Sequence, residues 1–132
     1  MVTEQPPIFH ITEPVLWRDA TERGSYDRST RDASLAEVGY IHCSYAHQVE
    51  TVANCLYADW AHDLVLLEID VAQVASPIRV ENLEGGTEEF PHIYGPIPAA
   101  AVTHVRPLER SDGRWQLPDL SARLEGADPV LE

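Results

Sequence analysis

The sequence contains no lysine. Its nine basic residues are all arginine and face 22 acidic residues, which gives a formal net charge of −13. Without a lysine side chain, Schiff-base catalysis by a lysine is excluded. No run of basic residues could supply the counterion release that drives binding to nucleic acid, and a negative surface repels phosphate backbones. We therefore expect no nucleic-acid partner.

Long apolar runs and cysteine motifs are also missing. No stretch approaches the roughly 20 apolar residues of a membrane span, and residues 1–7 do not form a charged-then-apolar leader. We therefore expect no membrane partner and a cytoplasmic location. Cys43 and Cys55 have no recognisable spacing motif, so they are expected to stay reduced.

The chain has the length of one domain. Its 132 residues suffice to bury about two-thirds of the surface of the unfolded chain without disulfides. Short strands with two helices early in the chain predict an α+β fold rather than a βαβ series. We expect one domain over residues 1–110 and a C-terminal extension, 111–132, that is partly mobile, with one last strand pairing at Trp115 and Leu117. The sequence leaves the oligomeric state open.

The apolar pattern predicts five strands, of which the third suits a sheet centre: Ile8–Thr12, Tyr40–Cys43, Leu64–Asp70, Ile78–Glu81 and Ala101–Leu108. We expect Thr12 to cap a helix that contains Pro14 and ends at Gly24. Ser44 is expected to cap a second helix, because the apolar positions from Val49 to Tyr57 keep helical spacing.

The segment Phe90–Pro98 combines an imidazole, a phenol, three prolines and a glycine. In extended backbone His92 and Tyr94 point to the same face. The prolines cannot donate backbone hydrogen bonds, so we expect this segment at a sheet edge or in a fixed loop, not in a central strand. Either the loop presents a site, or proline and glycine merely shape a turn in which Tyr94 packs.

Several sequence segments, in the order in which they occur, resemble those of a known family: Ile8–Thr12, Gly39–Ser44, Leu66–Asp70, Val80–Glu81 and Phe90–Ile97. From about Ile8 to Leu108 the chain closely resembles the bacterial domain of unknown function family 952. More remotely it resembles the ADP-ribosyltransferase-like fold. That resemblance implies a small core of mixed or antiparallel sheet with two helices, and a ribose-containing ligand of the NAD or ADP-ribose type.

The remote resemblance implies roles for residues of the first two blocks. His10 matches a first-strand histidine that contacts ribose, and we predict that it is catalytic. His42 and Ser44 match a block that supplies polar groups to the pocket. Two alternatives stay open, because His10 could be a hydrogen-bonded core histidine and Ser44 a helix cap.

A late-strand glutamate of the resembled fold stabilises the ribosyl cation, but the matching segment around His92 and Tyr94 has no carboxylate. Glu81 could take its place if it leans into the pocket. We therefore name His92 and Glu81 as further catalytic candidates, with His92 as acid or base, and Tyr94 as a ligand-binding residue.

A phosphate-bearing ligand would need a local positive charge on this acidic protein. Arg28 and Arg31, in the predicted polar loop of residues 25–32, are the ligand-binding candidates, with Arg79 as a third.

A metal site is the competing interpretation of the histidines. His10, His42, Cys43, His92 and Glu81 are ligand types that zinc or iron accepts, but none of them has the short spacing typical of such sites. We predict no metal site. We also disfavour Cys43 as a nucleophile, because a strand cysteine among apolar residues usually packs as a small hydrophobe.

These observations lead to one main expectation and two alternatives. The main expectation is an enzyme or former enzyme that binds a ribose-containing nucleotide, with ADP-ribosyl transfer or glycohydrolysis as the chemistry and NAD as the cofactor that the resemblance suggests. The first alternative is a non-catalytic module for a small ligand, and the second is an interaction domain without a ligand. In either ligand-binding case we expect His10, His42 and His92 to surround one cavity.

Overall fold

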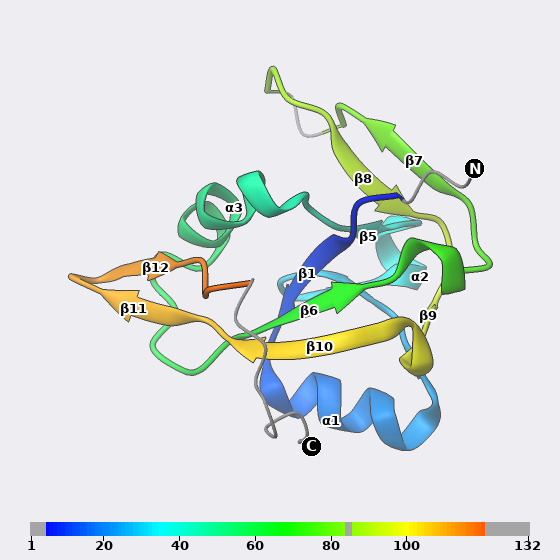
Figure 1. The fold of residues 1–132 in the computed structure, drawn as a ribbon, viewed down its shortest axis with the longest axis horizontal. Helices are drawn as coiled ribbons and strands as arrows, with labels where there is room; N and C mark the ends of the chain where they lie inside the picture. Colours follow the sequence, from blue (N-terminus) through cyan, green and yellow to red (C-terminus); the bar gives the residue numbers. More distant parts are fainter. Residues whose placement is uncertain (1–4, 84–85, 121–132) are drawn as a thin grey trace.

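Two three-stranded antiparallel sheets carry the fold in the computed structural model, which describes residues 5–83 and 86–120 (Figure 1). The first sheet has the order β1-β6-β10, with bounds Ile8–Thr12, Val65–Ile69 and Val102–Pro107. The second has the order β5-β8-β7, with bounds Ile41–His42, Phe90–Ile93 and Ile78–Glu81. Three short pairs join β2 to β9, β3 to β4 and β11 to β12, with bounds Ser25–Tyr26, Ile97–Pro98, Arg28–Thr30, Ala33–Ser34, Glu109–Ser111 and Arg114–Gln116.

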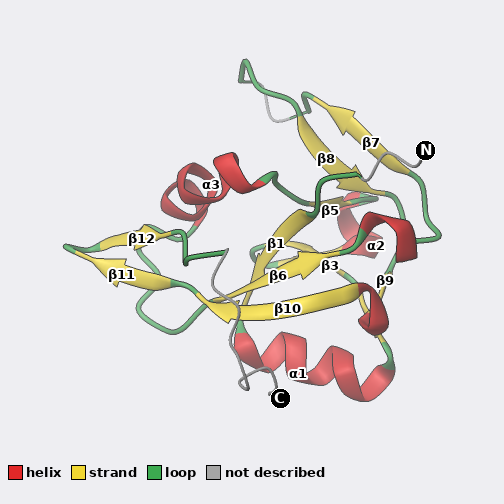
Figure 2. Cartoon of the chain, viewed as in Figure 1, coloured by secondary structure: helices red, strands yellow, loops and turns green. Residues whose placement is uncertain are grey.

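Three α-helices lie among these strands in the described part of the chain (Figure 2). They are α1, α2 and α3, with bounds Pro14–Arg23, Leu35–Val38 and Val49–Leu56. Three single turns of 3₁₀-helix are η1, η2 and η3, at Ala46–Gln48, Val71–Gln73 and Ala99–Ala101. The α+β class is therefore confirmed, with three helices where the sequence predicted two.

Strand β6 forms the centre of the first sheet, as its apolar sequence predicts. Alternate side chains of its partner β1 enter two separate core clusters: Ile8 packs with Leu67 and Ile69, whereas Phe9 and Ile11 pack on the opposite face. Helix α1 contributes to the first cluster and α3 to the second. The two long helices therefore cover opposite faces of this sheet.

Both predicted helix caps are wrong, although both helices exist. The residue before α1 is Glu13, and the hydroxyl of Thr12 instead bonds that of Tyr26. Ser44 pairs its backbone with Phe9 and so continues the strand, while Gln48 is the residue that precedes α3. In both places a tertiary contact holds the residue that local sequence assigns to a cap: Thr12 through its hydroxyl and Ser44 through its backbone.

Residues 25–32 are not the polar loop that the sequence predicts, because they contain β2 and β3. Tyr26 and Ser29 are almost completely buried, at 1% and 0% exposure, and their burial holds this polar segment in extended form. The short helix α2, which the sequence did not predict, follows at once. Its first turn has a capping box in which Ser34 and Glu37 bond each other's backbone N–H groups.

Strand β8 lies in the middle of its sheet, so the predicted edge position is wrong. The position of Pro91 explains why a proline is tolerated there. Its carbonyl accepts a hydrogen bond from the N–H of Cys43, just beyond the end of β5. In an antiparallel strand the N–H and C=O of one residue face the same neighbour. The missing N–H of Pro91 therefore falls where the pairing with β5 ends.

The C-terminal part of the described chain forms the hairpin β11-β12, which confirms the predicted pairing at Trp115. Trp115 is 4% exposed and packs in the second core cluster. The predicted mobility of residues 121–132 concerns positions outside the described residues. No described helix is both long and apolar enough to cross a membrane.

Candidate functional site

The candidate site lies on one face of the second sheet, where the strands place polar residues in a row. His42, His92 and Arg79 are direct cross-strand neighbours on β5, β8 and β7. The adjacent row, Ile41, Ile93 and Ile78, packs in the first core cluster. Since successive residues of a strand point to opposite faces, the two imidazoles and the guanidinium share the face that points away from that core.

Glu81 belongs to the same face and turns toward β8. Its Oε2 lies 3.1 Å from Nδ1 of His92 and accepts a 2.5 Å hydrogen bond from the Tyr94 hydroxyl. The bond from Tyr94, followed by that from His92, lowers the pKa of the Glu81 carboxyl, and the same carboxylate raises the pKa of the Tyr94 phenol. Glu81 is thus a carboxylate at neutral pH. Its side chain points toward His92 and Tyr94, a direction that the sequence alone did not determine.

Two further side chains enclose this group. The Tyr40 ring stacks on His92 with 4.3 Å between centroids and lies 5.5 Å from Tyr94. The Arg79 guanidinium lies 5.1 Å from the centre of the Tyr94 ring. We call these five residues, Tyr40, Arg79, Glu81, His92 and Tyr94, the carboxylate cluster. His92 is completely buried within it, so its imidazole contacts protein groups and not bulk solvent.

His10 is held in a separate hydrogen-bond chain. Its Nδ1 lies 2.7 Å from the carbonyl oxygen of His42, and its Nε2 lies 2.7 Å from the Tyr26 hydroxyl, which in turn lies 2.8 Å from that of Thr12. A carbonyl only accepts, so the proton is on Nδ1, and Nε2 accepts from Tyr26 while Thr12 donates to Tyr26. Burial lowers the pKa of His10 to about 4, so the ring is neutral with both nitrogens bonded.

The three imidazoles are therefore connected in series instead of surrounding one large cavity. His10 bonds the backbone of His42, whose ring lies 5.6 Å from that of His92. His10, His42 and Ser44 line a recess of only about 10 Å³, which is about the room of one water molecule. This places Ser44, at 3% exposure, beneath the surface.

A larger groove of about 340 Å³ opens beside His42. Its lining includes the aromatic rings of Tyr40, His42 and Phe90, of which His42 and Phe90 belong to the second sheet. It also includes residues of α3, such as Thr51 and Leu56. Tyr40 belongs both to the groove and to the carboxylate cluster, so the cluster adjoins the groove through one shared side chain.

Strand β3 supplies Ser29 and Thr30 to the same groove. The Ser29 side chain is completely buried, and its Oγ has no hydrogen-bond partner among the described residues. Sequence reasoning missed Ser29 because it stands in a polar segment that reads as a loop. A single serine between Arg28 and Thr30 carries no local signal of burial.

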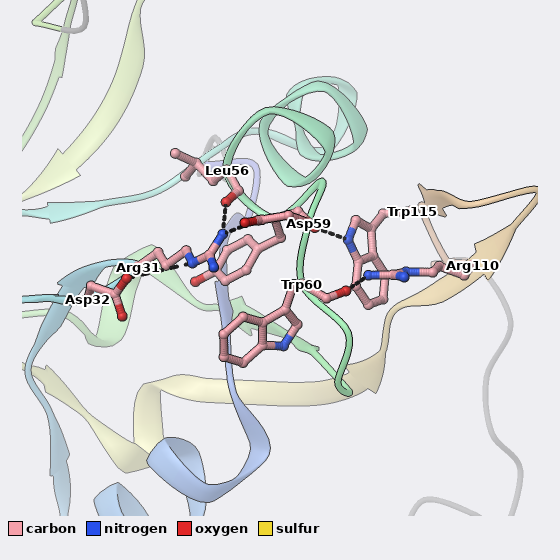
Figure 3. Close-up of polar contacts among 8 residues, drawn as sticks. Arg31, Asp32, Leu56, Asp59, Trp60, Arg110 and Trp115 are labelled. Carbon is pink, nitrogen blue, oxygen red and sulfur yellow. Dashed lines mark hydrogen bonds and ion pairs between the residues drawn. The ribbon is translucent and has the colours of Figure 1, made fainter.

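Arg31, a predicted ligand-binding residue, is engaged elsewhere (Figure 3). Its Nη1 donates to the Leu56 carbonyl and to Asp59, each at 2.7 Å, and its guanidinium lies 5.4 Å from the ring centre of Tyr57 and 5.0 Å from that of Trp60. The bond from Arg31 holds the pKa of the Asp59 carboxyl below its ordinary value. Arg31 thus secures the loop after α3 to β3, and its charge is already paired.

The other arginine candidates differ in their access to the site. Arg28 lies on β3 next to Ser29, and its buried Nε has no hydrogen-bond partner in the described part of the chain. Arg79 is exposed and is the arginine that neighbours the imidazole row. Arg79 is therefore the better placed of the two to meet an anionic group.

The side chains that could bind a metal are dispersed. Across residues 5–83 and 86–120, no three His, Cys, Asp or Glu side chains converge on one point. Cys43 lies in the apolar core, where burial raises the pKa of its thiol. A buried thiol with a raised pKa is a poor nucleophile, so the structure gives Cys43 a packing role.

The sequence profile of one family, described as "Protein of unknown function (DUF952)", matches residues 11–105. The chain belongs to the DUF952 family. Solved structures of CC0527 from Caulobacter crescentus are similar: the crystal structure has 31% sequence identity and a TM-score of 0.66, with 84% of this chain and 94% of that chain covered. The solution NMR structure has 25% identity and a TM-score of 0.67, with 83% and 90% covered. No curated protein matches the sequence. Both comparisons extend over most of this chain.

Proposed function

We propose that this DUF952 protein binds a ribose-containing nucleotide of the NAD or ADP-ribose type in the groove beside His42. The observation that carries the proposal is the groove itself, with its wall of three rings and its hydroxyl groups. Its volume of about 340 Å³ lies at the lower end of the range of small-molecule sites. A nucleoside-sized part of the ligand fits within it, and the remainder extends over the surface.

The charge distribution supports this orientation. The groove is lined by apolar, aromatic, hydroxyl, imidazole and thiol groups, with neither a carboxylate nor a guanidinium among the lining residues. Arg79, on the same sheet face, supplies the local positive charge that a phosphate needs on a protein of net charge −13. The resemblance to the ADP-ribosyltransferase-like fold favours the same ligand class.

The direct test blocks the groove. Thr51 is an exposed α3 residue on its wall, so Thr51→Trp fills the space without touching the core. Thr21→Trp, at an exposed position of α1, is the matched control. By calorimetry with ADP-ribose and NAD, wild type and Thr21→Trp should bind equally, and Thr51→Trp should bind at least about tenfold more weakly. Equal affinity of all three proteins, or no binding by wild type, would refute the proposal.

A second candidate function is catalysis on that ligand, either ADP-ribosyl transfer or glycohydrolysis. The observation that favours it is the Glu81 carboxylate, which Tyr94 and His92 hold in the ionised form. An oriented carboxylate stabilises a developing ribosyl cation. His10, with both nitrogens bonded and a low pKa, fits a positioning role better than that of an acid or base.

Release of nicotinamide from NAD tests this candidate. Glu81→Gln keeps a hydrogen-bonding side chain but removes the charge, so it should abolish turnover and leave NAD affinity within about twofold. Turnover by Glu81→Gln at the wild-type rate would exclude Glu81 from the chemistry. Binding without turnover by wild type would leave the protein as a non-catalytic binding module.

A further inference from the structure

A second cavity, of about 500 Å³, lies on the face of the first sheet that carries Phe9. It shares no lining residue with the groove beside His42, so the two are separate sites. Apolar side chains line it together with the rings of Phe9, Tyr45 and His47 and the carboxylate of Glu68. A mostly apolar cavity with a few polar groups is the usual form of a small-molecule site.

We propose that this second cavity binds an organic amine in its ammonium form, carried on an apolar body, and that Glu68 recognises the positive charge. The proposed ligand is independent of the nucleotide proposed for the groove beside His42.

Glu68 presents one carboxylate oxygen that the folded chain does not use. Its side chain shares a sheet face with that of its cross-strand neighbour Phe9. Oε1 of Glu68 lies 2.6 Å from Nη1 of Arg106 and 3.5 Å from Nδ1 of His104, whereas Oε2 has no hydrogen-bond partner among the described residues.

This second oxygen can be reached from the cavity. In the described chain, fully buried side-chain polar atoms without a partner occur only within residues 28–31, so Oε2 of Glu68 keeps accessible surface. The Glu68 side chain as a whole is 18% exposed and lines the cavity. A carboxylate has about four acceptor positions, so the ion pair with Arg106 fixes the group and leaves Oε2 for a ligand.

The charge of the ligand follows from the lining. Glu68 is the carboxylate of the cavity, no arginine is among the described residues that line it, and Arg106 is almost completely buried. An anion would be repelled by Glu68 and by the net charge of −13. An ammonium group gains a charge-assisted hydrogen bond to Oε2.

The apolar body follows from the other lining residues. Pro7 and Leu120 offer apolar surface, and the rings of Tyr45 and His47 lie 6.3 Å apart at an angle of only 4°. Burial of apolar area stabilises a complex, and aromatic rings attract cations. An inorganic cation would use the carboxylate alone, whereas an amine with an apolar body uses both kinds of surface.

Three probes of similar size test the charge: 2-phenylethylamine, 2-phenylethanol and 3-phenylpropionate. The alcohol forms hydrogen bonds but is neutral, and the propionate is an anion. In NMR titrations of the wild-type protein we expect the amine to bind on the order of tenfold more tightly than the alcohol, because hydrogen bonds to charged groups are the stronger ones. The propionate should bind most weakly. The largest amide shifts should lie at Phe9, residues 45–48 and Glu68.

Removal of the charge isolates the part of Glu68. Glu68→Gln keeps a hydrogen-bonding side chain, so it should lose most of the preference for the amine over the alcohol. The matched control is Glu109→Gln, at an exposed position of β11, which should keep the preference. Because Glu68→Gln also deprives Arg106 of its ion-pair partner, its melting temperature is measured in parallel.

A second variant leaves that ion pair intact. Ala46 lines the cavity from the 3₁₀ turn η1, so Ala46→Trp should fill the space and abolish saturable binding of the amine. Ala100→Trp, at an exposed position of the 3₁₀ turn η3, is the matched control and should bind the amine as wild type does.

Equal affinity of wild type for the amine and the alcohol, tighter binding of the propionate, or no binding of the amine would overturn the proposal. So would an unchanged preference in folded Glu68→Gln, or amine binding by Ala46→Trp. Failure of ADP-ribose to bind in the groove beside His42 would remove only the nucleotide.

Discussion

At the scale of single residues, the hydrogen bond from Tyr94 to Glu81 decides the ionisation of the carboxylate cluster. The bond stabilises the charged form of Glu81 and is the largest contribution to its lowered pKa. In Tyr94→Phe the pKa of Glu81 should therefore rise, which carbon-detected NMR of the carboxyl group measures. An unchanged or lower pKa in Tyr94→Phe would show that another group holds the charge.

The same low pKa links Glu81 to stability. A carboxyl group that is easier to ionise in the folded state stabilises the protein above its unfolded pKa, near 4.5, and this contribution disappears as the pH falls through the folded value. Glu81→Gln should accordingly flatten the loss of stability below about pH 4.5. A parallel loss in wild type and Glu81→Gln would contradict the lowered pKa.

His10 gives a second pH dependence, at higher pH. Its pKa falls from 6.5 in the unfolded chain to about 4 in the buried site. Between pH 6.5 and 4 the imidazole is therefore protonated in the unfolded chain but neutral in the folded protein. The free energy of unfolding should drop by up to about 3 kcal/mol between pH 6.5 and 4. Urea titrations at several pH values measure it.

The matched variants are His10→Gln and His104→Gln. His10→Gln should be less stable at pH 7 and should lack the decline between pH 6.5 and 4. His104 is an exposed residue of β10, so His104→Gln should retain the decline. The same slope in His10→Gln as in wild type would mean that other groups cause the acid sensitivity.

At the scale of elements, the turn after β8 depends on a close approach between two segments. A Cβ on Gly95 would lie 2.7 Å from the Cβ of Ser76 and would clash with its hydroxyl. Gly95→Ala should therefore lower the free energy of unfolding by about 1 to 3 kcal/mol, measured by urea denaturation. Ser76→Gly should rescue the Gly95→Ala variant. Failure of that rescue would locate the cost elsewhere.

Elements with regular apolar patterns could be predicted from the sequence. The bounds of β1 and β7 match the predicted Ile8–Thr12 and Ile78–Glu81, and α1 ends at Gly24, which adopts φ 88° as a helix-ending glycine does. Strands β2 and β3, which pair with β9 and β4, could not be predicted, since a polar segment becomes extended only through burial of Tyr26 and Ser29.

The site was predictable only where a strand fixes the direction of a side chain. Because side chains alternate along a strand, the sequence predicts that His92 and Tyr94 share a face. His42 and Arg79 join this row only through the register between strands that are distant in sequence, which the sequence does not reveal. The ion pair that removes Arg31 from the site depends on a loop 28 residues away. Contacts of this kind carry no local signal.

At the scale of the whole molecule, a neutral groove and a charged cluster lie next to each other on an acidic protein. The groove is formed by β3, β5, β8, α2 and α3, so binding should report on elements that are far apart in sequence. The carboxylate cluster adjoins it through Tyr40. A ligand in the groove should therefore perturb both, and should leave the β11-β12 hairpin unchanged.

The most direct test of the central claim is a ¹⁵N NMR titration of the wild-type protein with ADP-ribose. We expect the largest amide shifts in β3, α3 and β5, with smaller shifts at Arg79 and Glu81. We expect no shifts in the β11-β12 hairpin, which serves as the internal control. Saturable shifts confined to other surfaces, or no shifts at millimolar ADP-ribose, would refute nucleotide binding in the groove.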